Sequence, residues 1–344
     1  MSQISLAATG DVLLHSRVYR LCKTKKGYEF KGKMSAAKEL LSSADLSIVN
    51  LEAIVAGEEI GLSSFPTFNN PVELAQTLKD FGTDIVTNSN NHALDFGEEG
   101  ALRSIQNLEA IGLDYVGSHK SKKDRSTFRV IERKGIKCAL LSFSAVSLGN
   151  QPPKGKEFLL NRIKSSTKSL RLEIEKLKKE HKPDVIIVSL HFGKEYALYP
   201  GGAQQELASS VSDCGADIII GHHPHVLQPA EWITNSRGKR TFVIYSLGNF
   251  YSGQKGLYRQ IGGSLHLDIK KHSKNPGDIS IEKPRLHLTY VDASKESGFQ
   301  MHSFLEYIKR NPYIKTDHDV FDSIEVYSEL SNRFKKWMPE IELK

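Results

Sequence analysis

Three runs in the second half of the chain are apolar from end to end instead of alternating with polar residues. They read DVIIVSL at 184–190, DIIIG at 217–221 and TFVIYSL at 241–247. Such β-branched runs are typical of strands whose two faces are both covered, as in a parallel sheet packed between other layers. This feature predicts an α/β fold and argues against a sheet with one face open to water.

The rest of the chain repeats a short apolar strand, a polar loop and an amphipathic helix. Further strands are predicted at 4–9, 46–49 and 84–89, and helices at 35–44, 71–81, 97–111 and 161–181. In the second of these helices, Asn70 is expected to be the N-cap, Pro71 the first helical residue and Gly82 the stop. The remaining pairs are predicted to be a hairpin at 127–133 and 136–144, and an antiparallel sheet that includes 264–270 and 285–291.

The length of 344 residues suits one large α/β domain, and no repeat or linker divides the sequence. Beyond residue 296 the pattern becomes helical and charged, with FLEYIKR and SELSNRFKKWM as the main segments. We therefore expect one domain over residues 1–295 and a helical C-terminal extension over 296–344 that packs on it.

The net charge of +7 at pH 7 favours an anionic partner, either a small molecule or a polymer. Lysines and arginines alternate with acids and form no long basic block, so we expect no nucleic-acid partner. No run approaches the ~18 apolar residues of a membrane span, and no signal peptide is visible, so a cytoplasmic location is expected. The three cysteines, Cys22, Cys138 and Cys214, have no paired spacing and are expected to be buried free thiols.

Polar residues able to bind metal or donate hydrogen bonds follow six of the predicted strands. In chain order they are Asp11 and His15; Asn50 and Glu52; Asn90, Asn91, His92 and Asp95; His191 and Glu195; His222, His223 and His225; and Asn249. The carboxyl ends of parallel strands line the ligand crevice of α/β sheets. Residues spread over most of the chain are therefore expected to converge on one place.

The chemistry of this set favours transition metals. It offers imidazole nitrogen, carboxylate and amide oxygen without any thiolate, which suits Mn, Fe, Zn or Ni rather than a structural zinc finger. About seven candidate ligands exceed what one tetrahedral ion uses. We therefore expect two divalent ions, Mn, Fe or Zn, of the kind that activates water and stabilises both the attacking and the leaving oxygen in hydrolysis.

Several of these residues also have an ordinary structural role open to them. Asp95 is expected to cap the following helix in preference to binding metal. Glu195 is either a surface residue or a carboxylate that orients a histidine. The remaining alternatives are a first helical turn for His15 and plain turn positions for Asn90, Asn91 and Asn249.

The GHHPH segment at 221–225 is the most specific part of the pattern. Pro224 stiffens the loop. His223 and His225 stand two positions apart, and in an extended backbone they would point the same way. A purely structural role for the whole segment is the less favoured interpretation.

Six motifs in this order resemble the CapA family of capsule (poly-γ-glutamate) synthesis proteins. They are GDVLLH, NLEAIV, NSNNHALDFG, SLHFGKEY, GADIIIGHHPHVLQP and YSLGNF, and they extend from about residue 4 to about residue 250. CapA-like domains are in turn similar to the calcineurin-like metallophosphoesterases. The resemblance implies a four-layer α/β/β/α sandwich of the metallophosphoesterase type, here with a helical C-terminal appendage. It also implies a dinuclear metal site with Asp11, Glu52, Asn91, His92, His191 and the GHHPH histidines at the ligand positions.

The motifs depart from the metallophosphoesterase pattern in ways that shape the expected roles. Asn50-Leu51-Glu52 replaces Gly-Asp-x-x-Asp, and His92 is followed by alanine instead of an acid. We expect His223 and His225 to be the metal ligands of the GHHPH segment, and His92 or His222 to donate a proton to the leaving group. The residues expected to orient ligands or face substrate are His15, Asn50, Asn90, Glu195 and Asn249.

Two functions are compatible with these features. The first is a metal-dependent hydrolase acting on an anionic substrate, either a phosphoester or a γ-glutamyl amide, by metal-activated water. The second is a non-catalytic component of poly-γ-glutamate or polysaccharide assembly that binds the polyanion in its cleft. The enzyme is the favoured interpretation.

Overall fold

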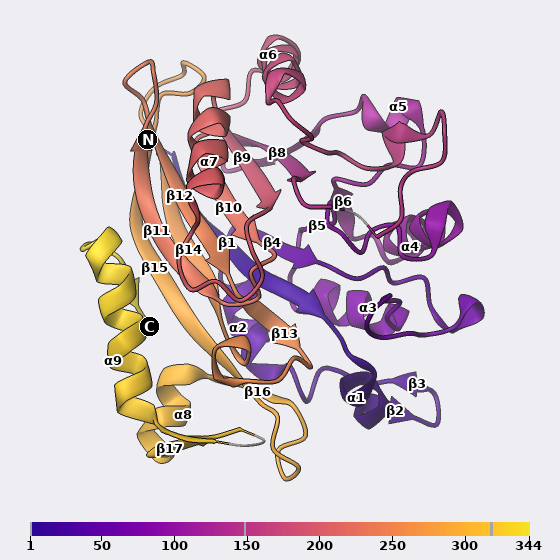
Figure 1. Ribbon diagram of the computed structural model, residues 1–344. Coiled ribbons are helices and arrows are strands. Elements are labelled where there is room, and N and C mark those ends of the chain that lie inside the picture. Colours follow the sequence, from indigo (N-terminus) through magenta and orange to yellow (C-terminus); the bar gives the residue numbers. More distant parts are fainter. Residues whose placement is uncertain (1, 148, 317–318) are drawn as a thin grey trace.

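A computed structural model describes residues 2–147, 149–316 and 319–344, and within them two large β-sheets form the centre of the molecule (Figure 1). The larger sheet has the strand order β16 (Gln300–Ser303), β15 (Ile279–Asp292), β14 (Ile261–Lys271), β1 (Ser2–Leu13), β4 (Leu46–Leu51), β5 (Ile85–Thr87) and β6 (Asp114–Val116), with β13 (Asn249–Ser252) paired to β1 and β19 (Glu342–Leu343) paired to β15. The smaller sheet has the order β11 (Leu227–Thr234), β12 (Arg240–Leu247), β10 (Ile218–His222), β9 (Val185–His191), β8 (Ile136–Ser144) and β7 (Arg129–Arg133).

Each sheet has a parallel half that carries the predicted buried strands. In the larger sheet β1, β4, β5 and β6 run parallel. In the smaller sheet β8, β9, β10 and β12 run parallel. The carboxyl ends of these strands are therefore available to line a common crevice, as in other open α/β sheets.

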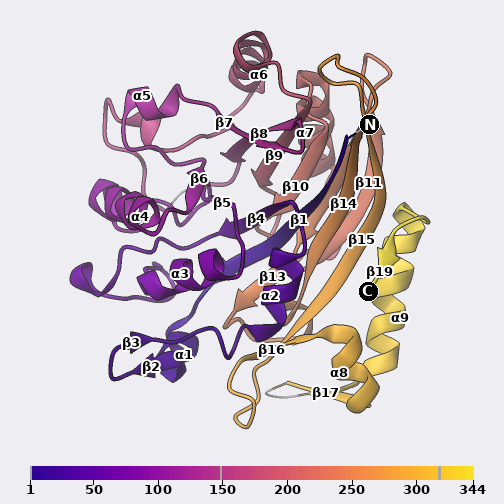
Figure 2. The same ribbon diagram turned by 180° about the vertical axis from the view of Figure 1, so that it is seen from behind.

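The two sheets pack face to face and helices cover their outer faces, which gives the four layers α/β/β/α (Figure 2). Side chains alternate across β4, where Leu46 and Ile48 point into the shared core while Val49 and Leu51 contact helices. This double burial explains why the strands are apolar throughout. The helices over the larger sheet are α2 (Ser35–Ser42), α3 (Val72–Asp80) and α4 (Gly97–Ile111), and those over the smaller sheet are α6 (Lys168–His181) and α7 (Gly202–Cys214).

The C-terminal segment packs along one edge of the sandwich. Helix α9 (Ser323–Trp337) buries Val326, Leu330 and Phe334 in the core shared by the two sheets. Helix α8 (Phe304–Arg310) lies beside β15 and β16, so the extension supplies strands to the larger sheet as well as helices. The described part of the chain holds no helix with both the length and the apolar composition needed to cross a membrane.

Short elements complete the chain. They are α1 (Ser16–Tyr19), η1 (Arg20–Cys22), β2 (Lys23–Thr24), β3 (Gly27–Tyr28), η2 (Glu58–Ile60), α5 (Lys122–Arg125), η3 (Glu157–Leu159), η4 (Leu257–Arg259), β17 (Tyr313–Lys315) and β18 (Val320–Asp322). The hairpin of β7 and β8 forms as predicted, with Lys134 and Gly135 at φ 49° and 78° in its two-residue turn. Cys22, Cys138 and Cys214 are buried and free.

Two sequence-based boundaries are wrong, and each has a physical reason. Asn70 does not cap α3, because its amide is used elsewhere: Leu14 N–H donates to its Oδ1 at 3.1 Å, and its Nδ2 donates to Leu14 C=O at 2.9 Å. The charged helix α6 begins at Lys168 and not at Asn161. The backbone of Asn161 is instead paired with Gly117 and Ser144, so it cannot enter a helix.

Candidate metal centre

The predicted site residues gather where the parallel strands of both sheets end. Asp11 lies in β1 beside Asn50 of β4 and Asn249 of β13. His191 and His222 lie side by side at the ends of β9 and β10. The strand order therefore brings together residues that are more than 200 positions apart in the sequence.

Asp11 is a fully buried carboxylate at the centre of a hydrogen-bond network. Its Oδ1 accepts from Asn50 Nδ2 at 2.8 Å and lies 3.2 Å from His222 Nδ1, while its Oδ2 lies 3.1 Å from His225 Nδ1. Burial alone would raise the pKa of Asp11, but the hydrogen bonds with His222 and His225 hold it well below its usual range. Asn50 is itself oriented by Thr87, whose hydroxyl donates to Asn50 Oδ1 at 3.1 Å.

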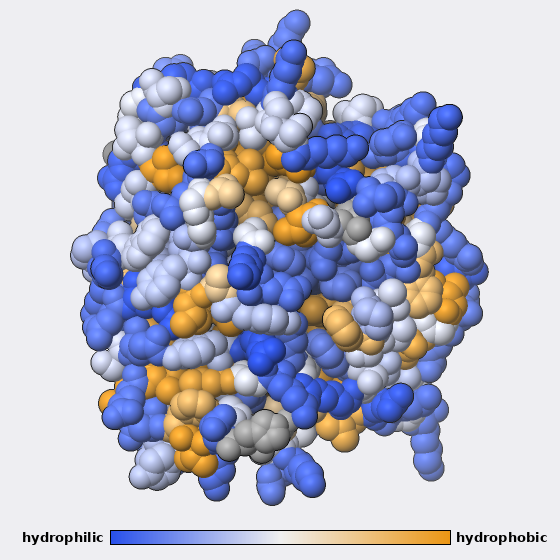
Figure 3. All heavy atoms as spheres, viewed as in Figure 1, coloured by the Kyte–Doolittle hydropathy of each residue, from blue (hydrophilic) through white to orange (hydrophobic). Residues whose placement is uncertain are grey.

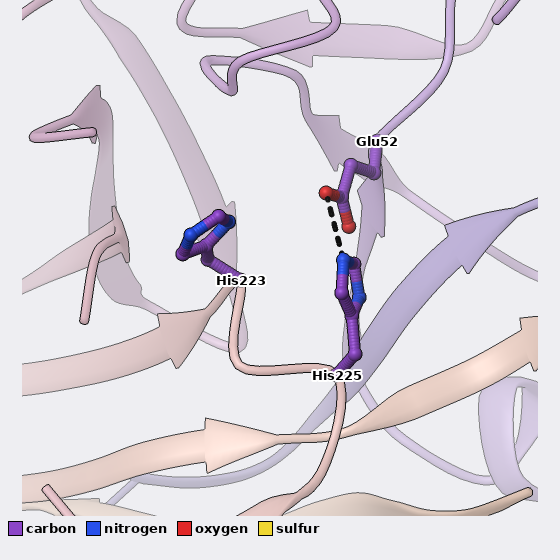
Figure 4. A group of neighbouring side chains, drawn as sticks. All are labelled: Glu52, His223 and His225. Atoms are coloured by element: carbon purple, nitrogen blue, oxygen red, sulfur yellow. Dashed lines mark ion pairs between the residues drawn. The ribbon is translucent and has the colours of Figure 1, made fainter. Parts of the chain in front are cut away.

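Glu52 is equally buried, and within the described residues neither of its oxygens accepts a hydrogen bond. Figure 4 shows its carboxylate pointing at the His225 ring, and the dashed line marks their ion pair. His191 Nε2 lies 3.4 Å and His225 Nε2 3.6 Å from Glu52 Oε1. Glu52, His223 and His225 each present one ligand atom, and these atoms all lie within 4.8 Å of one another. Burial raises the pKa of Glu52 to about 8. A buried carboxylate without hydrogen bonds is costly unless a cation compensates it.

The imidazoles around Glu52 differ in their protonation. Burial lowers the pKa of His191 well below its usual range and that of His223 to about 3, so both rings are neutral at pH 7, the form that binds metal. Each has a buried Nδ1 without a hydrogen-bond partner. Burial opposes protonation of His225 as well, but the neighbouring Glu52 and Asp11 carboxylates raise its pKa to about 9.

His191 also contacts Asn91 and His223. Asn91 Oδ1 lies 2.7 Å from His191 Nε2, and the rings of His191 and His223 have centroids 4.9 Å apart. Six of the seven predicted ligands thus form one continuous contact network, namely Asp11, Glu52, Asn91, His191, His223 and His225.

The backbone of the GHHPH segment is not extended, and the expectation that it would be is wrong. His223 and His225 have φ of 97° and 58°, in the region that non-glycine residues seldom adopt. The backbone turns sharply after β10, so that the His223 N–H approaches Asp11 Oδ2 at 3.4 Å. The rings of His223 and His225 nevertheless both lie close to Glu52. Backbone strain of this kind is concentrated at functional sites.

His92, the seventh predicted ligand, follows Asn91 on the same turn and bonds to Asp95. The His92 Nδ1 lies 2.7 Å from Asp95 Oδ2, which also accepts the Phe68 N–H at 2.6 Å. Asp95 does not cap α4, whose first turn has no side-chain cap, so the capping interpretation is wrong. The acid absent after His92 is supplied three positions later, and the sequence spacing HALD could have indicated it.

The residues expected to orient ligands lie around this network at different depths. Asn90 is buried, donates from Nδ2 to Leu51 C=O at 3.0 Å and accepts the His92 N–H at 3.0 Å. Asn249 Oδ1 lies 3.1 Å from His225 Nδ1. Both asparagines therefore do more than form turns. Glu195 is exposed in the loop that follows β9.

His15 and His92 flank the ring of Phe68. The centroid distances are 5.1 Å for His15 and 4.7 Å for His92, both with edge-to-face geometry. Burial lowers the pKa of His15 to about 4, and its Nδ1 has no hydrogen-bond partner. His15 therefore enters the site as a neutral ring beside Phe68 and has no direct contact with the carboxylates.

A cleft of about 1170 Å³ opens beside this contact network, which is called the metal-ligand network below because its members are the predicted ligands. His223 and Asn91 form its inner end, and Lys164, Lys194 and Glu195 lie along its walls. Apolar residues lie between them, and Figure 3 shows hydrophobic side chains gathered in the upper middle of this face, beside α7. The cleft can accept a ligand much larger than a single phosphate group.

Comparison with known proteins agrees with the resemblance seen in the sequence. The family model described as bacterial capsule synthesis protein PGA_cap matches residues 5–254. The PGA biosynthesis protein CapA of Bacillus subtilis is 34% identical over 249 residues, which cover 66% of this chain and 61% of that protein. The capsule biosynthesis protein CapA of Bacillus anthracis is 32% identical over 224 residues, covering 63% and 50%.

The chain therefore spans less than two thirds of the length of these relatives. Among solved structures, a putative 5′-nucleotidase from Staphylococcus aureus has a TM-score of 0.49 and 15% identity, with 83% of this chain and 54% of that chain covered. The match of the family model extends over the strands that hold the network, from Asp11 to Asn249. The chain thus belongs to the bacterial capsule synthesis protein family, PGA_cap.

Proposed function

We propose that this protein is a metal-dependent hydrolase that cleaves a phosphoester or γ-glutamyl amide bond in an anionic substrate. The observation that carries the proposal is Glu52, a fully buried carboxylate whose two oxygens have no hydrogen bond although imidazoles surround them. A metal ion would satisfy both oxygens of such a group, whereas the nearest imidazoles, His191 and His225, lie 3.4 and 3.6 Å from one of them. Carboxylate and neutral imidazole are ligands that Mn, Fe and Zn share.

The donor set fits two divalent ions. The residues that would hold them are Asp11, Glu52, Asn91, His191, His223 and His225. Bound ions would supply hydroxide at neutral pH and polarise the scissile bond. Within this set, Asn50 and Asn249 fix the orientation of Asp11 and His225 through their amides.

The proton for the leaving group is assigned to His92. Its Nδ1 faces the Asp95 carboxylate, so Nε2 is the nitrogen left to carry a proton toward substrate. His92 is only partly buried, whereas His222 is almost fully buried and bonded to Asp11. His222 is therefore better suited to orient Asp11 than to donate a proton.

The net charge of the chain and its relatives support the proposal of an anionic substrate. The chain has a net charge of +7, and Lys164 and Lys194 line the cleft beside His223. The relatives from Bacillus are named for poly-γ-glutamate and capsule biosynthesis. These names support a polyanionic substrate here.

The test is hydrolysis by the untagged protein reconstituted with Mn²⁺ or Zn²⁺. Bis(p-nitrophenyl) phosphate and poly-γ-glutamate serve as substrates, and His223→Ala is compared with His272→Ala, an exposed histidine in the β14–β15 hairpin. We expect His223→Ala to lose the activity and His272→Ala to keep it. Equal activity of both variants, or no hydrolysis of either substrate by the reconstituted protein, would contradict the proposal.

A second candidate is a non-catalytic component of poly-γ-glutamate or polysaccharide assembly. The size of the cleft favours it, since a polyanion needs an extended surface, and the net charge of +7 favours an anionic ligand, while the cleft itself is lined by two lysines and two glutamates. This role predicts that the metal-free protein binds poly-γ-glutamate with an affinity that falls as salt rises. Hydrolysis that depends on His223 would decide against it.

A further inference from the structure

Arg259 places a positive charge close to the metal-ligand network, outside the part of the chain that the family model matches. The match ends at residue 254, and Arg259 ends the short helix η4. Its guanidinium carbon lies 4.7 Å from the centroid of the Tyr196 ring, and that ring is 6.2 Å from the ring of His225. Tyr196 thus stands between the arginine and a proposed metal ligand.

Both ends of this arrangement are fixed to the site by backbone hydrogen bonds. The Tyr196 N–H donates to Pro224 C=O at 2.8 Å, which ties the loop after β9 to the GHHPH segment. The Arg259 C=O accepts from Asn249 Nδ2 at 2.9 Å, and Asn249 Oδ1 contacts His225. Arg259 is therefore connected to His225 in two ways, through Asn249 and through the Tyr196 loop that is bonded to the GHHPH segment.

The local backbone is adapted to keep the side chains in these positions. Tyr196 has φ of 62°, a conformation that a tyrosine seldom adopts. Gly256 has φ of 100°, and a Cβ at that residue would lie 2.7 Å from an Arg259 terminal nitrogen. The arginine folds back over Gly256 only because no side chain is there.

Among the described residues, the guanidinium has no acidic partner that would neutralise it. Within the described residues, Arg259 forms no ion pair with a carboxylate, and its side-chain partner is Tyr196. Glu195 also interacts with Tyr196, but it is exposed and forms no ion pair with Arg259 in the part of the chain that the structure describes. An arginine stacked on an aromatic ring keeps its planar fork of donors free for an oxyanion.

We propose that Arg259, held on the ring of Tyr196, binds a second anionic group of the substrate while the bond to be cleaved lies at the metal-ligand network. The inference rests on the proposed function for the position of the scissile bond. It makes the preferred substrate class a chain with several anionic groups, such as carboxylates or phosphates, and a small monoanion gains nothing from Arg259. Arg259 is then a specificity residue that contributes to binding and takes no part in bond cleavage.

Binding and hydrolysis are measured separately, so that failure of one is distinguishable from failure of the other. Isothermal titration calorimetry follows a γ-linked glutamate decamer and a linear polyphosphate of similar length, with metal-loaded protein and with protein in EDTA. Steady-state kinetics follow bis(p-nitrophenyl) phosphate, which carries one charge. The variants are Arg259→Gln and Arg259→Lys, with Arg310→Gln as the matched control, an exposed arginine at the end of α8.

We expect Arg259→Gln to weaken binding of one polyanion by about 10- to 100-fold, the usual effect of losing a charge-assisted hydrogen-bond pair. Arg259→Lys should lose an intermediate amount, because it keeps the charge but not the planar fork. KM and kcat for the singly charged phosphodiester should stay within about twofold. The polyanion with the larger dependence on Arg259 identifies the anionic group.

Two results would overturn the inference. Affinities of Arg259→Gln for both polyanions within about twofold of the Arg310→Gln control would show that Arg259 binds no substrate anion. An equal loss for the singly charged phosphodiester would show a general disturbance of the site. If the polyanion arm responds as expected but no substrate is hydrolysed, the inference about Arg259 stands and the proposed reaction fails.

Discussion

Replacement of Glu52 by glutamine should make the metal-free protein more stable, although most substitutions of buried residues destabilise. The carboxylate is fully buried and accepts no hydrogen bond, and burial raises its pKa from the ordinary 4.5 to about 8. A raised carboxyl pKa means that the folded state binds the proton more tightly than the unfolded state. Each pH unit between 4.5 and 8 therefore costs about 1.4 kcal/mol of folding free energy.

At pH 7 this cost is at most about 3 kcal/mol, and glutamine avoids it because it carries no charge, while part of the gain is offset because His225 loses the carboxylate that raises its pKa. With an unfolding entropy of ~2.1 cal/mol/K per residue, a chain of this length should gain up to about 4 °C in Tm. The advantage of Glu52→Gln should shrink as the pH falls toward 4.5, because the glutamate is then protonated in both states. Differential scanning calorimetry in EDTA at several pH values measures this difference.

Addition of metal should reverse the order of the two proteins. At a free Mn²⁺ concentration of about 1,000 times Kd, the wild type should gain about 4.1 kcal/mol, which exceeds the advantage of about 3 kcal/mol that Glu52→Gln has in EDTA, while the variant lacks a ligand and gains less. Glu132→Gln, an exposed residue of β7, is the control for loss of one negative charge. A Glu52→Gln protein that is less stable than wild type in EDTA would show that the buried carboxylate does not destabilise the metal-free fold. A variant that keeps the full metal-dependent gain in stability would show that Glu52 is not a metal ligand.

Three further perturbations test other parts of the structure. Asp95→Asn should lower kcat for phosphodiester hydrolysis by roughly 10²-fold or more at unchanged metal content, because His92 loses the carboxylate that orients it. An unchanged kcat would mean that His92 takes no part in the mechanism. Asn70→Ala should cost about 1–3 kcal/mol in urea unfolding, since both backbone groups of Leu14 lose their buried partner, and a cost near zero would mean that water replaces the amide. Cys138, whose pKa burial raises to about 12, should resist Ellman's reagent at pH 8 until the protein is unfolded, and rapid labelling of the native protein would contradict its burial.

Much of the fold could be predicted because the relevant signals are local and periodic. The uninterrupted apolar runs predict strands covered on both faces, and β9, β10 and β12 are buried in this way. The gathering of Asp11, Glu52 and His191 could be anticipated for a related reason, since each lies at or near the carboxyl end of a strand in the parallel half of one of the two sheets. Strand ends are fixed by topology, so distant residues meet there without any local sequence signal.

The errors arise where a side chain satisfies a distant backbone or where the backbone leaves the common regions. Asn70 has the sequence of an N-cap, but its amide is taken by Leu14, which is 56 positions away. The positive φ of His223 and His225 could not be read from a His-His-Pro-His sequence, because it depends on the tertiary contacts of the loop.

Residues outside the recognised motifs were missed for a different reason. The motifs end near residue 250, and the interaction of Arg259 with Tyr196 joins two loops that no spacing rule connects. Asp95 lies within a motif, but its position just before a helix predicts a cap, whereas its carboxylate bonds to His92. The contact of Arg259 with Tyr196 is specified by the packing of loops around the site, whereas the bond of Asp95 to His92 is local and its spacing is a usable signal.

The proposed function depends on metal ions binding to the buried carboxylates and imidazoles at the strand ends. Metal stoichiometry measures this binding without the need for a known substrate. Untagged protein is stripped with chelator, dialysed against Mn²⁺ or Zn²⁺ and analysed for metal by mass spectrometry, with His225→Ala alongside. We expect about two equivalents of metal bound to the wild type and a clear loss of bound metal in the variant. Wild-type protein that takes up no stoichiometric metal under either condition would contradict the account.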